Sequence, residues 1–324
     1  MTKQNRAFVG GVLVLIALYA NNSSTLTKPI AARPLLLAHR GVHQDFPHEG
    51  VTKDTCTASR IFPPHNNFME NTIPSITEAF KDGADLVEFD IHPTTDGSWA
   101  VFHDWVLDCR TNGQGVTRNH ALAYLKTLDV GYGYTADGGK TFPLRGQGVG
   151  LMPSLDEVLS AFPNGSFLIH IKSNDPREGE ALVTKLKTLP NSTLRNLMVY
   201  GGNRPVSIVR SKMPDLRTVC LKMEKNCLVT YAALGWTGYI PTDCRNSLLI
   251  VPANIAPWLW GWPNRFLRRM MNVGTEVFVA DDLKSGGLKG LNGPEDLRKL
   301  PKGYSGGIWT DQIDVVGPAL RGRR

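Results

Sequence analysis

Two acidic residues share one face of a short apolar segment. Glu88 and Asp90 are two positions apart in the run LVEFDI at 86–91, which has the composition of a buried β-strand. Because strand side chains alternate, both carboxylates point to the same face. Buried carboxylates repel each other and lose hydration unless a cation compensates them. The segment therefore predicts a site for a hard divalent cation, with salt bridges to basic neighbours as the structural alternative.

Two histidines follow other predicted strands. His39 and Arg40 come at the end of the run LLLAH at 35–39, and His103 ends the run WAVFH at 99–103. An imidazole can transfer a proton near neutral pH, and a guanidinium can bind a phosphate oxygen. Two such histidines flanking a carboxylate pair indicate acid–base chemistry on a phosphate.

A lysine and a further histidine share one face of the run FLIHIK at 167–172. These residues are His170 and Lys172. A lysine directed into a protein interior needs an anionic partner, which a bound phosphate would supply. Glu70 and Asn71 precede a predicted helix, where Asn71 or Thr72 could also serve simply as the helix cap.

The elements that must position these residues alternate between strand and helix. Helical periodicity occurs at 73–81, 155–161, 176–189 and 265–273. Eight candidate strands are Leu35–His39, Leu86–Ile91, Phe167–Lys172, Leu197–Tyr200, Thr218–Leu221, Leu248–Val251, Val277–Ala280 and Gly307–Thr310. This alternation predicts an α/β fold, a (β/α)₈ TIM barrel, whose active site forms at the carboxyl ends of the strands.

Two long insertions interrupt the strand–helix alternation, at 42–69 and 104–150. Long loops in a compact domain are usually functional, and both are expected at the active-site face. The second contains Gly131-Tyr132-Gly133-Tyr134, but a dinucleotide-binding interpretation fails because no strand leads into it and no helix follows.

Several short motifs occur in the order seen in glycerophosphodiester phosphodiesterases, and over about residues 35–315 the sequence resembles that family. The motifs are His39-Arg40-Gly41, Glu70-Asn71-Thr72, Gly83-Ala84-Asp85, Glu88-x-Asp90, Thr95-Asp96-Gly97, Phe102-His103-Asp104, Pro153-Ser154-Leu155-Asp156-Glu157, Ile171-Lys172 and Thr310-Asp311. The resemblance implies a barrel of the phospholipase C-like phosphodiesterase type. It also implies metal-dependent hydrolysis of glycerophosphodiesters to sn-glycerol 3-phosphate and an alcohol.

The resemblance also implies residue roles. His39 and His103 would be the general acid–base pair, and Arg40 and Lys172 would bind the phosphate. Glu88 and Asp90 would hold the metal, with Glu70 and Asn71 supporting it. Whether water attacks directly, or a glycerol hydroxyl first forms a cyclic phosphate, stays open.

One position departs from the family pattern. The family places a glutamate as third metal ligand two residues before the lysine, and this chain has His170 there. An imidazole makes the site less negative and softer, which favours Mg²⁺, Mn²⁺ or Zn²⁺ over Ca²⁺. We expect one divalent cation, Mg²⁺ first, with Ca²⁺ or Mn²⁺ as alternatives; His170 could instead only contact the phosphate.

Three tryptophans, Trp258, Trp260 and Trp262, follow the sixth predicted strand. They could fill the barrel rim, or form an apolar wall for a lipid tail or a choline-like headgroup at the catalytic face. The second arrangement would favour a lysophospholipid substrate.

The N-terminus has the pattern of a targeting signal. A basic start precedes the uncharged stretch Ala7 to Ala20, which matches a secretory signal cleaved after Ala20; an uncleaved inner-membrane anchor is the alternative. We expect residues 1–20 to be that signal or anchor, 21–34 a linker, 35–318 the catalytic domain and 319–324 a basic tail. Export to the periplasm or beyond would permit one or two disulfides among five cysteines, of which Cys220 and Cys227 are nearest in sequence, and would leave at least one thiol free.

The composition is that of a globular protein, with 42% hydrophobic and 20% charged residues. The net charge of +7 suits a small phosphate-bearing substrate or contact with an anionic membrane surface. No basic run with interleaved aromatics indicates nucleic acid binding, and no obligate protein partner is evident. A lysophospholipase D-like enzyme is the first alternative function, and a phosphodiester-binding protein impaired by His170 is the second.

Overall fold

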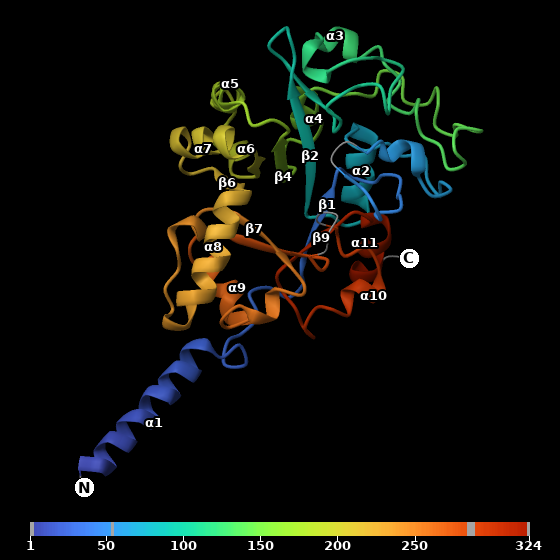
Figure 1. Ribbon diagram of the computed structural model, residues 1–324. Coiled ribbons are helices and arrows are strands. Elements are labelled where there is room, and N and C mark those ends of the chain that lie inside the picture. The colour runs from blue at the N-terminus through green and yellow to red at the C-terminus, as the bar shows by residue number, and fades with distance from the viewer. Residues whose placement is uncertain (1–2, 53–54, 284–288, 323–324) are drawn as a thin grey trace.

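Eight parallel strands form a nearly closed barrel in the computed structural model, which describes residues 3–52, 55–283 and 289–322 (Figure 1). The order around the barrel is β6-β5-β4-β2-β1-β9-β8-β7, and the short strand β3 (Trp99–Val101) pairs antiparallel with β2. The barrel strands are β1 (Leu35–His39), β2 (Leu86–Pro93), β4 (Phe167–Ile171), β5 (Leu197–Gly201), β6 (Arg217–Cys220), β7 (Leu248–Pro252), β8 (Glu276–Ala280) and β9 (Gly307–Thr310). The predicted barrel is confirmed, and each predicted strand lies within two residues of an observed one at both ends.

Side chains close the seam between β6 and β7, where no β-ladder joins the two strands in the part of the chain that the structure describes. The Ser247 hydroxyl donates to the Thr218 carbonyl oxygen over 2.9 Å. The Ile250 amide donates to the Glu224 carboxylate over 2.6 Å. These bonds satisfy backbone groups that a missing ladder would leave open.

Helices cover the outside of the barrel. They are α2 (Ile73–Lys81), α4 (Leu155–Ala161), α5 (Pro176–Leu186), α7 (Asn203–Lys212), α8 (Leu221–Leu234), α9 (Asn264–Met271) and α11 (Ile313–Arg321), with the short α6 (Asn191–Leu194) and α10 (Pro294–Leu297) between them. The short α3 (Leu122–Leu125) lies in the second insertion. Thr72 caps α2, and Ser154 with Glu157 forms a capping box on α4. The sequence pattern did not single out α7 and α8. For α8 the reason is that it follows β6 directly, with no turn residue to mark its start.

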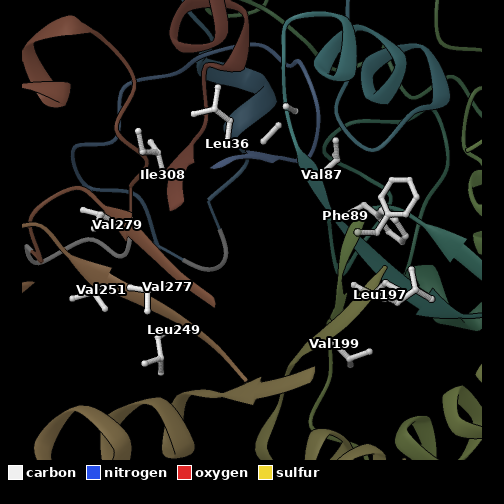
Figure 2. Close-up of a cluster of buried hydrophobic side chains, with 14 of the residues drawn as sticks. Leu36, Val87, Phe89, Leu197, Val199, Leu249, Val251, Val277, Val279 and Ile308 are labelled. Atoms are coloured by element: carbon white, nitrogen blue, oxygen red, sulfur yellow. The ribbon is translucent and has the colours of Figure 1, made fainter. Parts of the chain in front are cut away.

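Alternation along the strands separates the two sides of the barrel wall. Val87 and Phe89 of β2 face the helices and belong to the apolar layer shown in Figure 2. Leu86 points the other way, into a barrel interior filled by apolar side chains such as Leu37, Leu168 and Phe278. Glu88 and Asp90 have the same parity as Leu86, so they continue this interior column toward the carboxyl ends of the strands.

The two insertions pack on each other with a small hydrophobic core of their own, and we call residues 42–69 and 104–150 the cap. Its core members include Ile61, Met69, Leu107, Leu125, Leu128, Tyr134 and Leu144. The Cys56–Cys109 disulfide ties the two insertions together. A Cβ at Gly133 would lie 1.9 Å from the Cys109 carbonyl oxygen, so this glycine allows close packing of the cap.

The structure defines the disulfide pairing, which the sequence left open, and it does not join the two cysteines nearest in sequence. Cys227 pairs with Cys244, and Cys220 is a free buried thiol. Cys220 is the last residue of β6 and Cys227 lies in α8, whereas Cys244 lies next to α8 after the chain has turned back. A free thiol was expected, and that expectation is confirmed.

The segments expected as an N-terminal linker and a C-terminal tail both contact the body of the protein. Ser23 and Thr27 are buried, and the Arg268 side chain donates to the Lys28 and Pro29 carbonyls, so the segment expected as a linker packs against the body. Arg321 lies in α11 and forms an ion pair of 2.6 Å with Asp85, so the predicted tail was wrong at this residue. Arg323 and Arg324 lie outside the described residues.

The N-terminal helix α1 (Lys3–Asn22) projects away from the body (Figure 1). Its apolar side chains are largely exposed, with Phe8 at 74% and Leu13 at 60%. Among the described residues, no helix combines the length and apolarity needed to cross a membrane.

Candidate active site

The two acidic residues of β2 are completely buried at the mouth of the barrel. The Tyr200 hydroxyl donates to Glu88 Oε1 over 2.6 Å, and the Arg40 amide donates to Glu88 Oε2 over 3.2 Å. Burial, and then the neighbouring Asp90 charge, raise the pKa of Glu88 well above its usual value. The surroundings of Glu88 therefore oppose its ionisation.

Cationic and amide groups surround Asp90. Its Oδ1 accepts from His170 Nδ1 at 2.8 Å and lies 3.2 Å from Lys172 Nζ. Its Oδ2 accepts from Asn71 Nδ2 at 3.0 Å and lies 3.4 Å from Arg40 Nε. Burial opposes ionisation, but the nearby charges of Lys172, His103 and Arg40 hold the pKa of Asp90 well below its usual range.

The donor set here fits a divalent cation. Glu88, Asp90 and His170 each offer a ligand atom, and these atoms lie within 4.8 Å of one another. Burial, and then the Lys172 charge, lower the pKa of His170 to about 4, so its imidazole is neutral, as a metal ligand must be. Its ring stacks on Tyr200 at 4.1 Å, which fixes its orientation. A dication would also favour ionisation of Glu88.

Arg40 follows β1 in the left-handed backbone region, with φ of +61°. This conformation is uncommon for a residue other than glycine and is typical of functional turns. The guanidinium Nη1 lies 3.1 Å from Glu70 Oε1, and its buried Nε has no hydrogen-bond partner. Arg40 thus retains a donor at the mouth of the barrel, where Lys172 also contacts Asp90.

A carboxylate orients the first strand-end histidine. His39 Nδ1 lies 2.6 Å from Asp311 Oδ1, and its Nε2 lies 3.8 Å from Glu88 Oε2. Because a carboxylate only accepts, Nδ1 carries the hydrogen and Nε2 keeps its lone pair toward the carboxylate pair. Burial, and then the Arg40 charge, lower the pKa of His39, so the ring is neutral near pH 7.

The second histidine has the same arrangement. His103 Nδ1 lies 2.6 Å from Asp104 Oδ1, and Asp104 Oδ2 accepts from Arg110 over 2.9 Å. Burial, and then Arg40 and Lys172, lower the pKa of His103 well below its usual value. An anionic phosphate bound to these two cations would offset that effect and favour protonation of His103.

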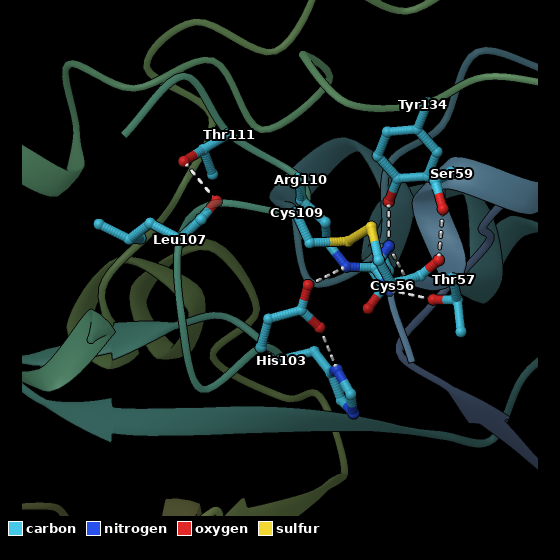
Figure 3. The surroundings of a disulfide bond; sticks show 11 residues. Cys56, Thr57, Ser59, His103, Leu107, Cys109, Arg110, Thr111 and Tyr134 are labelled. Atoms are coloured by element: carbon cyan, nitrogen blue, oxygen red, sulfur yellow. Dashed lines mark hydrogen bonds and ion pairs between the residues drawn. A yellow bond between two sulfur atoms is a disulfide. The ribbon is translucent and has the colours of Figure 1, made fainter. Parts of the chain in front are cut away.

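A chain of contacts leads from His103 into the cap, as Figure 3 shows. Arg110 bonds to Tyr134 and Thr57 and forms a 2.9 Å ion pair with Glu70. Its neighbour Cys109 is bonded to Cys56. The cap therefore fixes the carboxylate that orients His103.

The structure brings together most of the residues named from the sequence. His39, Arg40, Glu88, Asp90, His103, His170 and Lys172 meet at the mouth, with Asn71 bonded to Asp90 and Glu70 held between two arginines. Sequence reasoning gave no role to Asp104, Asp311, Arg110 or Tyr200. Asp104 and Asp311 lie inside the quoted motifs, and Tyr200 ends a predicted strand, so these positions were the available signal. Arg110 carried none.

The contacts of the tryptophans do not support the alternative of an apolar wall at the catalytic face. Trp260 Nε1 donates to the Ala232 carbonyl in the last turn of α8, and Trp262 packs on Tyr304, which precedes β9. Both contacts lie at the amino-terminal end of the barrel, because the β7–α9 connection returns there before α9 begins. Trp258 is 81% exposed. The exposed aromatic next to a catalytic motif is Trp105, which follows Asp104 and is 45% exposed.

A model of the glycerophosphoryl diester phosphodiesterase family matches residues 39–222, more than half of the chain. The chain belongs to the glycerophosphoryl diester phosphodiesterase family. The family and the enzyme class predicted from the motifs, a phosphoric diester hydrolase, are thereby confirmed.

Individual relatives in the glycerophosphoryl diester phosphodiesterase family agree with the match. A glycerophosphodiester phosphodiesterase of Bacillus subtilis is 33% identical over 69% of this chain and 75% of its own length. A human lysophospholipase D is 28% identical over 57% of each chain. These names describe the relatives.

Solved structures share the fold at lower identity. The glycerophosphoryl diester phosphodiesterase domain of a Mycobacterium tuberculosis protein superposes with a TM-score of 0.60 at 16% identity, covering 90% of this chain and all of that one. An Oleispira antarctica phosphodiesterase in complex with the product sn-glycerol-3-phosphate superposes with a TM-score of 0.54 at 17% identity, covering 90% and 96%.

Proposed function

We propose that this protein hydrolyses glycerophosphodiesters to sn-glycerol 3-phosphate and an alcohol, with the help of one divalent cation. The observation that carries the proposal is a pair of imidazoles, each oriented by its own carboxylate, beside a buried acidic pair and two cations. The names of the Bacillus subtilis relative and of the product complex support the same substrate class.

Arg40 and Lys172 would hold the phosphate. Both contact Asp90, at 3.4 Å and 3.2 Å, and both are mostly buried. When a phosphate binds at the mouth, Arg40 and Lys172 would lose part of their attraction to Asp90 and would gain charge-assisted hydrogen bonds to the phosphate. Arg40 Nε is available for this, since its 3.4 Å contact with Asp90 is an ion pair without a hydrogen bond.

His39 and His103 would divide the proton transfers. With its hydrogen held toward Asp311, His39 presents a lone pair and can accept a proton from the attacking hydroxyl. His103, with its pKa raised by the bound phosphate, would give a proton to the leaving alkoxide. The same geometry would also allow His103 to act as the base and His39 as the acid.

Glu88, Asp90 and, as third ligand, His170 would hold the cation. When bound, the cation would act as a Lewis acid that stabilises negative charge on the phosphate oxygens. Asn71 would orient Asp90, because it donates to that carboxylate from its side chain and accepts from the Asp90 amide.

A lysophospholipase D-like activity remains the second candidate because of Trp105. Trp105 directly follows His103-Asp104, and an exposed indole there could contact the apolar chain or the choline group of a lysophospholipid. Trp105→Ala would then reduce turnover of lysophosphatidylcholine several-fold more than that of glycerophosphocholine. Equal effects on both substrates would remove this candidate.

We also propose that the protein is exported. The Cys56–Cys109 and Cys227–Cys244 disulfides support an oxidising compartment. Asn21 and Asn22 are bonded to Arg269 of the body, so cleavage after Ala20 would remove an exposed helix and leave these contacts. N-terminal sequencing of the exported protein should begin at Asn21; an intact N-terminus in the membrane fraction would support the anchor instead.

The direct test of the proposed function is release of glycerol 3-phosphate from glycerophosphocholine. We expect turnover to disappear after chelation and to return with Mg²⁺ or Mn²⁺. Binding of the diester without release under every metal condition would indicate the impaired binding protein.

A further inference from the structure

A third histidine lies beside the His39–Asp311 pair and has no role in the hydrolysis proposed above. His43 comes four residues after His39 and is buried, with 7% of its surface exposed. His39, His43 and Asp311 each offer a ligand atom, and these atoms lie within 4.8 Å of one another. The two imidazoles meet edge to face, with ring centroids 6.3 Å apart.

The hydrogen bonds of His43 define which ring nitrogen is available. Its Nδ1 lies 3.0 Å from the Gln44 carbonyl oxygen, which only accepts, so Nδ1 carries the hydrogen. Nε2 therefore has a lone pair, and it is buried with no hydrogen-bond partner. Unpartnered buried acceptors are rare because they lose hydration without compensation. A histidine whose second nitrogen donates to a backbone carbonyl is the usual form of a metal ligand.

We propose that His39, His43 and Asp311 form a second metal site that takes Zn²⁺ and inhibits the enzyme. Two imidazoles, one carboxylate and an open fourth position suit Zn²⁺, whereas the oxygen-rich Glu88–Asp90 group suits a harder cation. His39 and Asp311 are now 2.6 Å apart across a hydrogen bond. Ligands about 2.0 Å from a tetrahedral Zn²⁺ lie about 3.3 Å apart, so a small movement would accommodate the ion.

Zn²⁺ at this site would remove the base. If the ion binds His39 Nδ1, the ring stays neutral and its single hydrogen moves to Nε2, which then can only donate. If the ion binds His39 Nε2, the metal occupies the lone pair that would otherwise accept the proton. In both cases His39 can no longer accept a proton. This inhibition rests on the proposed role of His39, whereas binding of Zn²⁺ does not.

The binding experiment compares the whole protein with His43→Gln in excess Mg²⁺, which occupies the harder site. Competition with a chromophoric chelator should show one Zn²⁺ bound by the unmodified protein and at least a tenfold weaker affinity in the variant. His65→Gln is the matched control, because His65 lies on the same loop but is exposed and paired with Asp314. It should bind Zn²⁺ as the unmodified protein does. If His43→Gln misfolds by circular dichroism, His43→Asn replaces it.

The same variants are then assayed for hydrolysis of glycerophosphocholine with added Zn²⁺. Zn²⁺ should inhibit the unmodified protein and His65→Gln, and His43→Gln should need at least tenfold more. Unchanged Zn²⁺ affinity in His43→Gln would contradict the proposed zinc site, even if the KM of this variant were raised. Zn²⁺ binding that depends on His43 but does not inhibit would support the site and contradict His39 as the base.

Discussion

At the scale of single residues, the site consists of polar groups whose protonation is set by their neighbours. Asp311 and Asp104 each accept a hydrogen bond from Nδ1 of a histidine, so Nε2 of each ring is left for proton transfer. Burial lowers the pKa of His103 most, and the charges of Arg40 and Lys172 lower it further. The same two cations would attract the phosphate, so substrate binding and proton transfer are coupled through them.

His103→Ala tests the acid–base pair. We expect kcat to fall by at least about 100-fold, because the leaving alkoxide would lose its proton donor. The urea unfolding midpoint should stay close to that of the unmodified protein, and the exposed His65→Ala provides the control for both measurements. Turnover unaffected by His103→Ala would remove this residue from the mechanism.

His170→Glu tests the third ligand. A carboxylate at this position would make the site harder and more negative, so Ca²⁺ should gain activity relative to Mg²⁺ by several-fold. The measurement is turnover of the chelated protein after addition of each metal in turn. Tyr200→Phe is the matched control, since it keeps the ring that stacks on His170 but loses the hydroxyl on Glu88. Identical metal profiles for His170→Glu and the unmodified protein would show that His170 is not a ligand.

At the scale of elements, the cap positions one half of the acid–base pair. It carries Asp104 and Arg110, and the Cys56–Cys109 disulfide joins its two insertions (Figure 3). The other half, His39 with Asp311, depends on the adjacent strands β1 and β9 of the barrel. Loosening the cap should therefore affect catalysis, not only stability.

Replacing Cys56 and Cys109 together by serine should lower kcat by about tenfold and the free energy of unfolding by about 2–5 kcal/mol. Replacing Cys227 and Cys244 together should cost similar stability but leave kcat near its original value, because that disulfide joins α8 to the outside of the barrel. Assays and urea denaturation of both pairs separate the two effects. Equal kcat losses in both double variants would contradict a positioning role of the cap.

At the scale of the whole molecule, barrel closure depends on side chains at one seam. The Glu224 carboxylate, partly buried, accepts from the Ile250 amide where β6 and β7 do not pair. Burial raises the pKa of Glu224 to about 7. In the unfolded chain the usual pKa of about 4.5 applies, so the folded state holds the proton more tightly.

The free energy of unfolding should therefore fall as the pH rises from about 4.5 through 7, by up to about 3 kcal/mol from this residue. Glu224→Gln keeps an acceptor for Ile250 without the ionisation, so its stability should change less over the same interval. Urea denaturation at pH 5 and pH 8 measures both proteins. The same pH dependence in the two would show that Glu224 does not contribute to it.

The sequence by itself determined the barrel and most of the site. Period-two alternation placed Glu88 and Asp90 on one face, and strand–helix alternation placed His39, His103 and Lys172 at the carboxyl ends of strands. These are local patterns, which depend on residues close in the chain. The metal and the substrate specificity stay predictions.

Only the tertiary structure decided which distant groups meet. Asp311 lies 272 positions from His39 in the chain, and Tyr200 lies 112 from Glu88, yet each pair is bonded. The disulfide partners and the position of Trp260 away from the mouth were likewise set by how loops return across the barrel. No local pattern encodes these contacts, because they depend on closure of the barrel and packing of the cap.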